Sequence, residues 1–140
     1  MKKIVFVCLG NICRSPMAEF VMKDLTKQYE IESRATSNWE HGNPIHHGTQ
    51  KIFRSHGVPY DVSKTSLQIS DQDFHTFDLI LGMDENNVAD LKRMAPPGTE
   101  HKIHLFAGES VPDPWYTGDF EETYRRVLAG CQEWLERLED

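Results

Sequence analysis

The chain has 140 residues and a formal net charge of −7, and residues 109–140 carry nine acidic side chains against three arginines. This length suits one domain with a single hydrophobic core, and no linker, repeat or low-complexity tract divides residues 1–140. An acidic chain without a basic stripe argues against nucleic-acid and anionic-membrane binding, and no apolar stretch approaches the length of a membrane span. Three cysteines, an odd number, argue against a disulfide framework and favour the reducing cytoplasm.

The N-terminal part of the chain predicts a strand, a tight loop and a helix. The β-branched apolar run at residues 4–7 predicts a buried strand. Ser15 followed by Pro16 predicts a helix start, with Ser15 as the cap, and the helix is expected to reach about Tyr29. Residues 8–14 therefore form a loop that joins the end of a strand to the beginning of a helix.

Strands and helices alternate through the rest of the sequence. We expect a short strand at 32–37, a helix that contains 50–53 and ends at Gly57, a strand at 78–81, a helix from 83 to about 94 and a strand at 102–106. Apolar residues at three- and four-residue steps from Phe120 to Leu138 predict a packed final helix with an acidic, solvated face. This succession predicts an α/β fold, a central parallel sheet of about four strands with helices on both faces.

The loop at residues 8–14 has the composition of a phosphate site with a nucleophile. In such folds ligands bind at the carboxyl ends of strands, where Cys8 lies. Loop amides and a helix N-terminus attract an anion and favour the thiolate of Cys8, while Arg14 offers two donors to phosphate oxygens. Gly10 permits a close approach or a positive φ, and Asn11 tolerates a left-handed turn. We expect Ser15 to donate to the Cys8 sulfur in addition to capping.

Two segments near opposite ends of the chain resemble one family. Residues 8–15 look like the active-site loop of the low-molecular-weight protein-tyrosine phosphatases, and Asp113 to Tyr116 is similar to their general-acid segment. The resemblance covers the whole chain and implies hydrolysis of phosphotyrosine in proteins, and of small aryl phosphates, with inorganic phosphate as product and no cofactor or metal. It implies that Cys8 is the nucleophile, that Arg14 stabilises the transition state and that Asp113 is the general acid and base. Three other acids lie in helix-start contexts, where capping is expected: Asp71, Asp73 and Asp84.

The resemblance also implies roles for neighbouring side chains. The phosphate-binding loop comprises Leu9, Gly10, Asn11, Ile12, Cys13 and Ser15, and Asn11, Ser33 and His56 match residues of a hydrogen-bond network that braces it. Leu9, Trp39, Trp115 and Tyr116 resemble the walls of a substrate slot, in which Trp115 replaces the commoner Tyr. The aromatic side chains are expected to form this slot or a patch for weak self-association. Cys13 is expected to trap an oxidised Cys8 as a disulfide.

Other functions use similar residues. An arsenate reductase of this fold needs resolving cysteines in a later segment, and the sequence has none between Cys13 and Cys131. A protein-arginine phosphatase has Thr in the loop where this chain has Ile12, and Ile12 favours a phenol ring over a guanidinium group. A phosphate-binding module without catalysis has no need of Asp113. A metal site would use Cys8, Cys13, His41, His46 and His47, but the neighbouring Arg14 repels a cation.

Overall fold

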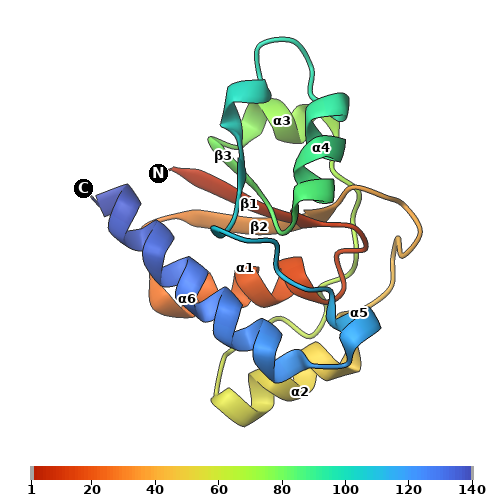
Figure 1. The fold of residues 1–140 in the computed structure, drawn as a ribbon, viewed down its shortest axis with the longest axis vertical. Coiled ribbons are helices and arrows are strands. Elements are labelled where there is room, and N and C mark those ends of the chain that lie inside the picture. Colours follow the sequence, from red (N-terminus) through yellow and green to blue (C-terminus); the bar gives the residue numbers. More distant parts are fainter. Residues whose placement is uncertain (1, 140) are drawn as a thin grey trace.

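The computed structural model describes residues 2–139 and has one four-stranded parallel sheet between helices (Figure 1). The strands are β1 (Lys3–Cys8), β2 (Glu30–Ala35), β3 (Leu79–Gly82) and β4 (Ile103–Leu105), in the order β2-β1-β3-β4. The helices are α1 (Arg14–Leu25), α2 (His47–His56), α3 (Asp71–Thr76), α4 (Glu85–Met94), α5 (Pro114–Thr117) and α6 (Phe120–Glu139), with a 3-10 turn at Glu100–Lys102. No helix in residues 2–139 combines the length and the apolar character that a membrane crossing needs.

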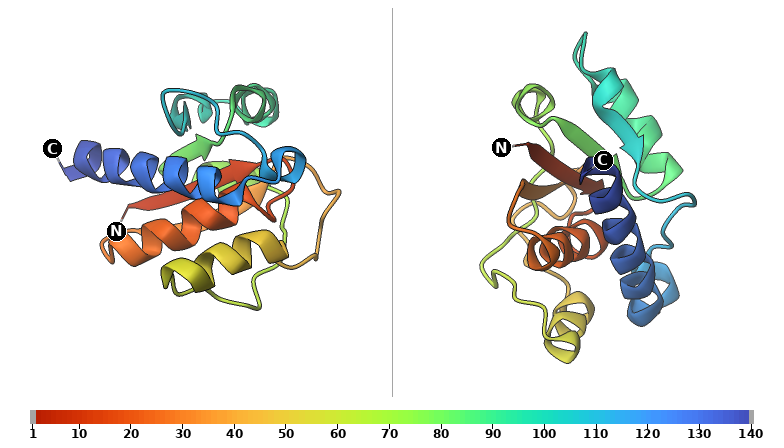
Figure 2. Two further views of the ribbon diagram at one scale, coloured as in Figure 1. Left: turned by 60° about the horizontal axis from the view of Figure 1, so that its bottom comes forward. Right: turned by 90° about the vertical axis from the view of Figure 1, so that its left-hand side faces the viewer.

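Strand β1 lies between β2 and β3 and is buried on both faces. Successive side chains of a strand point to opposite faces, so Ile4 and Phe6 join the larger core with α1, α2 and α6, while Val5 and Val7 join a smaller core with α3 and α4. Figure 2 shows the two groups of helices on opposite sides of the sheet. This arrangement directs the carboxyl end of β1, and Cys8 with it, to the edge where the loops gather.

The predicted fold class is confirmed, and most element boundaries differ by one or two residues. The first helix is displaced further: it begins at Arg14 and ends at Leu25, where Thr26 is extended, rather than at about Tyr29. The expected end of α2 at Gly57 is confirmed, because Gly57 takes the left-handed conformation that closes a helix (φ 68°). The four-residue helix α5 was not predicted, since a single turn leaves no periodicity to detect.

Candidate active site

The loop after β1 wraps around the sulfur of Cys8. The backbone N–H of Asn11 points at Cys8 Sγ at 3.2 Å, and Ser15 Oγ lies 3.0 Å from the same sulfur. Asn11 takes the predicted left-handed conformation, with φ of 56°. Gly10 allows a close approach of the Glu40 side chain, which would lie 3.3 Å from a Cβ at this position.

Ser15 does not cap the helix, so this prediction is wrong. The helix begins one residue earlier, with Cys13 as its N-cap and no side-chain capping bond. Ser15 is fully buried in the first turn, and its hydroxyl donates to the backbone carbonyl of Arg34 at 3.3 Å. Its hydroxyl lies within hydrogen-bonding distance of the Cys8 sulfur, and either atom can be the donor, so donation from Ser15 to the sulfur stays a prediction.

A buried hydrogen-bond network supports the loop from below. Asn11 Nδ2 donates to Ser15 Oγ at 2.8 Å and to Ser33 Oγ at 2.9 Å, and Ser33 donates to Glu19 Oε1 at 2.6 Å. Glu19 is 2% exposed and forms ion pairs with Lys23 at 2.6 Å and Lys64 at 3.8 Å. Because a carboxylate only accepts, Ser33 must use its proton on Glu19 and accept from Asn11. Glu19 therefore fixes the direction of the hydrogen bond between Asn11 and Ser33 beneath the loop.

His56 lies outside this network, which corrects the role expected for it. Within residues 2–139, the side-chain hydrogen bonds of His56 go to Glu121, at 3.0 and 3.1 Å, and its ring stacks on Tyr124. His56 is the last residue of α2 and faces α6 rather than the loop. Glu19 and Lys64 belong to the network instead of His56. No sequence pattern marked these two residues, because Glu19 lies well before β2 and Lys64 well after it.

Arg14 is buried at the start of α1 and is held by groups far along the chain. It is 3% exposed, and its Nη1 donates to Asp84 Oδ2 at 2.7 Å and to the Val111 carbonyl at 3.0 Å. Its Nη2 lies 3.4 Å from Asp113 Oδ2. Burial alone lowers the pKa of Arg14, but the charges of Cys8, Asp84 and Asp113 outweigh burial and raise the pKa above its usual value. Arg14 therefore remains a fixed cation beside Cys8.

Asp84 combines a capping role with contact to Arg14. The expectation that it caps a helix is confirmed: Asp84 is the N-cap of α4, and its Oδ1 accepts from Asn87 N at 2.7 Å. Asp73 likewise completes a capping box with Ser70 at the start of α3. The contact between Asp84 and Arg14 was not predicted, because the two residues are 70 positions apart.

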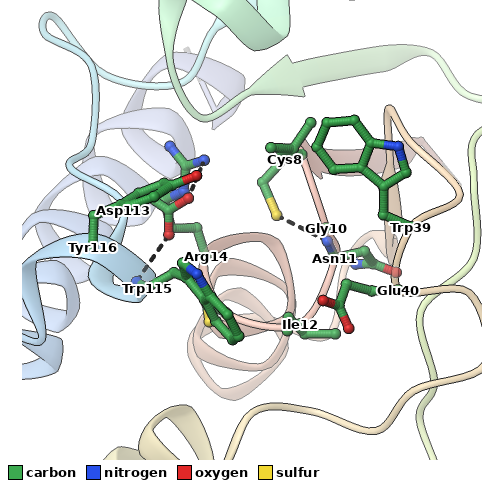
Figure 3. Close-up of a pocket in the computed structure, with 12 residues that line it drawn as sticks. Cys8, Gly10, Asn11, Ile12, Arg14, Trp39, Glu40, Asp113, Trp115 and Tyr116 are labelled. Carbon is green, nitrogen blue, oxygen red and sulfur yellow. Dashed lines mark hydrogen bonds and ion pairs between the residues drawn. The ribbon is translucent and has the colours of Figure 1, made fainter.

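The pocket above the loop brings the predicted catalytic residues together (Figure 3). Asp113 is the N-cap of α5 and accepts from the Trp115 N–H at 3.0 Å. Three exposed aromatic side chains stand at the rim: Trp39 (75% exposed), Trp115 (56%) and Tyr116 (79%). The lining comprises Cys8, Leu9, Gly10, Asn11, Ile12, Cys13, Arg14, Trp39, Glu40, Asp113, Trp115 and Tyr116. Of these lining residues, only Glu40 was not among the predicted site residues.

The second and third thiols lie in different surroundings. Cys13 lines the pocket but is 4% exposed, and burial, followed by the charges of Cys8 and Asp113, raises its pKa strongly. Cys131 is fully buried in α6, and burial raises its pKa strongly as well. Both are therefore neutral thiols, and all three cysteines are free. Within residues 2–139, no group of three or more His, Cys, Asp or Glu side chains lies close enough to hold a metal ion.

Comparison with known proteins decides the family. The model of the low molecular weight phosphotyrosine protein phosphatase family matches residues 3–140. The chain belongs to this family. The phosphatase is 40% identical to the low molecular weight protein-tyrosine-phosphatase PtpA of Staphylococcus aureus, over 99% of this chain and 94% of PtpA. It is 38% identical to YfkJ of Bacillus subtilis, over 99% of this chain and 97% of YfkJ. The crystal structure of SP-PTP from Streptococcus pyogenes superposes with a TM-score of 0.96 at 61% identity, covering 99% of this chain and 93% of SP-PTP.

Proposed function

We propose that this phosphatase hydrolyses phosphotyrosine in proteins and peptides through a cysteinyl-phosphate intermediate. The observation that carries the proposal is the meeting of a thiol, a buried guanidinium and a carboxylate around one pocket. Cys8, Arg14 and Asp113 come from the end of β1, the start of α1 and the cap of α5. A thiolate nucleophile, a cation beside the transferred group and a proton donor are what phosphoryl transfer to and from an aryl oxygen requires.

In the first step the Cys8 thiolate attacks phosphorus, and the bond between phosphorus and the tyrosine oxygen breaks. Hydrogen bonds from Asn11 N–H and Ser15 Oγ to the sulfur favour the thiolate over the thiol. Arg14 and the loop amides bind the equatorial phosphate oxygens, where negative charge spreads in the transition state. Asp113, protonated at this stage, gives its proton to the leaving phenolate.

In the second step water releases the phosphate. The Asp113 carboxylate takes a proton from the water, the water oxygen attacks phosphorus, and the bond between sulfur and phosphorus breaks. Inorganic phosphate leaves, Cys8 is again a thiolate and Asp113 is again protonated. The same carboxyl group therefore acts as acid and then as base, and no cofactor takes part in either step.

Substitutions at the two reacting groups test the assignment. With para-nitrophenyl phosphate as substrate, Cys8→Ser is expected to abolish turnover. Asp113→Ala is expected to lower kcat by roughly 10²–10⁴, and the part of the pH–rate profile that reports the titration of the general acid should change with it. Asp71→Ala, which removes an exposed carboxylate at the start of α3, is the matched control and is expected to keep full activity. Full activity of Cys8→Ser would overturn the mechanism.

The substrate side chain is tested separately. Ile12 lines the pocket and is 8% exposed, so an apolar side chain meets the group attached to the phosphate. We therefore expect phosphotyrosine peptides to be hydrolysed far faster than phosphoarginine or phosphoserine peptides of the same sequence. Faster hydrolysis of phosphoarginine would favour the protein-arginine phosphatase. An arsenate reductase is disfavoured because the third thiol, Cys131, is buried in α6 away from solvent.

Three further expectations belong to this proposal. The free thiols support a reducing, cytoplasmic location, which cell fractionation tests. The exposed aromatic rim supports substrate binding or weak self-association, and sedimentation at increasing concentration separates the two. Cys13 beside Cys8 supports reversible protection by a disulfide, which mass spectrometry after mild peroxide tests.

A further inference from the structure

The segment that carries Asp113 is fixed at two points, one on each side of the carboxylate. Before it, Val111 is buried; its N–H donates to the Met83 carbonyl at 2.9 Å, and its own carbonyl accepts from Arg14. After it, the chain passes through α5 and turns at Gly118 into α6, which begins at Phe120. The position of Asp113 therefore depends on where Val111 and Phe120 are held.

The ring of Phe120 lies on the first turn of α2. It stacks on the His46 ring at 5.2 Å between centroids and 19° between planes. On the same turn, a Cβ at Gly48 would lie 2.5 Å from an atom of the Phe120 ring, so only glycine leaves room for it. The rings of His46 and Trp115, which lies two residues after Asp113, form a T-shaped pair at 5.6 Å between centroids and 80° between planes. One imidazole thus contacts α5 and α6 at once.

The same turn of α2 is also attached to the phosphate-binding loop. The backbone N–H of His46 donates to the Ile12 carbonyl at 2.8 Å. Thr49, fully buried, donates from Oγ1 to the Cys13 carbonyl at 3.3 Å. Residues 46–49 therefore contact the loop of Cys8 through the His46 N–H and the Thr49 hydroxyl, and the segment of Asp113 through the His46 ring.

The plane of the His46 ring is itself fixed. His46 is the N-cap of α2, and its Nδ1 accepts from the Gly48 N–H at 3.0 Å. This bond requires an unprotonated Nδ1, and the His47 ring stacks on His46 at 4.2 Å. Burial and the charge of His47 lower the pKa of His46, while Glu40 opposes them, so the ring is neutral at neutral pH.

We propose that His46 is a positioning residue that holds the Asp113 carboxylate over the phosphate-binding loop through Trp115 and Phe120. The proposal rests on the proposed function, in which Asp113 protonates the leaving group. A loss of the ring contacts moves the acid segment relative to Cys8 and reduces proton transfer, while nucleophilic attack is left intact. The effect must then grow with the basicity of the leaving group, because a poor leaving group depends most on its proton.

Two substitutions separate the ring contacts from the helix cap. His46→Asn keeps a capping acceptor but removes the aromatic surface, whereas His46→Phe keeps the ring and removes the acceptor. For His46→Asn we expect kcat/KM to fall about tenfold with phenyl phosphate and by a smaller factor, about threefold, with para-nitrophenyl phosphate, whose more acidic leaving group depends less on protonation. His46→Phe is expected to recover most of the loss. His75→Asn, at an exposed histidine of α3, is the control and is expected to match the wild type.

A double substitution decides whether the effect passes through Asp113. Asp113→Asn should show the same leaving-group dependence more strongly, and adding His46→Asn to it should cost nothing further. Equal losses with both substrates, or full additivity with Asp113→Asn, would show that His46 acts on the loop or the fold and would overturn the positioning role. If Asp113→Asn itself shows no leaving-group dependence, the assignment of the general acid fails, and the role of His46 falls with it. Urea unfolding of each variant confirms that the protein compared is folded.

Discussion

Replacement of Asp84 tests how Arg14 is kept charged in a buried position. Asp84 accepts from Arg14 Nη1 at 2.7 Å and caps α4, and its side chain is 20% exposed against 3% for Arg14. Removing one partner of a buried ion pair costs about 3–5 kcal/mol in the free energy of unfolding. The Val111 carbonyl and Asp113 remain near Arg14 and Asp84 is partly solvated, so we expect a smaller loss, about 2 kcal/mol.

The two roles of Asp84 are separable because asparagine caps helices as well as aspartate does. Asp84→Asn should lose only the ion pair, about 2 kcal/mol, and Asp84→Ala should lose the cap in addition, for a total of about 3 kcal/mol. Ser70→Ala removes the equivalent N-cap of α3, away from Arg14, and should cost about 1 kcal/mol with unchanged activity. We also expect kcat/KM to fall about tenfold in both Asp84 variants, because the guanidinium loses the group that orients it.

Urea unfolding and steady-state kinetics on the four proteins give both quantities. The difference in the free energy of unfolding between Asp84→Asn and wild type measures the ion pair. The difference between Asp84→Ala and Ser70→Ala measures the part of the Asp84 contribution that is not due to helix capping. If Asp84→Asn unfolds at the wild-type urea concentration and Asp84→Ala loses no more than Ser70→Ala, Asp84 is only a cap. Arg14 would then be sufficiently stabilised by its other partners.

Other consequences of the structure are measurable with single substitutions. Ser15→Ala removes a hydrogen bond to the Cys8 sulfur and should lower kcat/KM roughly 10- to 100-fold, as expected for a bond to a charged group; unchanged kcat/KM would exclude that contribution. Gly130→Ala places a Cβ 2.4 Å from the Phe106 ring and should destabilise the protein by about 1–3 kcal/mol in urea unfolding, unless Phe106 can move. The pKa of His46 is lowered below 6.5 in the folded protein, so just below pH 6.5 the unfolded chain binds more protons than the folded protein. The free energy of unfolding should therefore fall as the pH drops below 6.5. The slope should be shallower in His46→Asn, and an identical slope would contradict the assignment.

The sequence by itself determined the parts of this protein that are contiguous in the chain. The apolar run before Cys8 predicted a buried strand, and the six residues after Cys8 predicted a phosphate site, because the geometry of a tight loop depends on its own residue types. Gly57 marked the end of α2 for the same reason. The wrong prediction that Ser15 caps α1 also has a local cause. The first turn of α1 begins one residue earlier, and the Ser15 hydroxyl contacts the Cys8 sulfur instead of capping the helix.

Only the tertiary structure decided which distant groups complete the site. Glu19 under the loop, Asp84 on Arg14 and His46 against the acid segment are joined to their partners by strand order and helix packing, which leave no local pattern. The sheet order β2-β1-β3-β4 places the carboxyl ends of β1 and β3 side by side, which brings Arg14 and Asp84 into contact across 70 residues. The loop from residue 8 to 15 thus specified the chemistry, and the packing of α2, α4 and α6 around it fixed the positions of the charged groups.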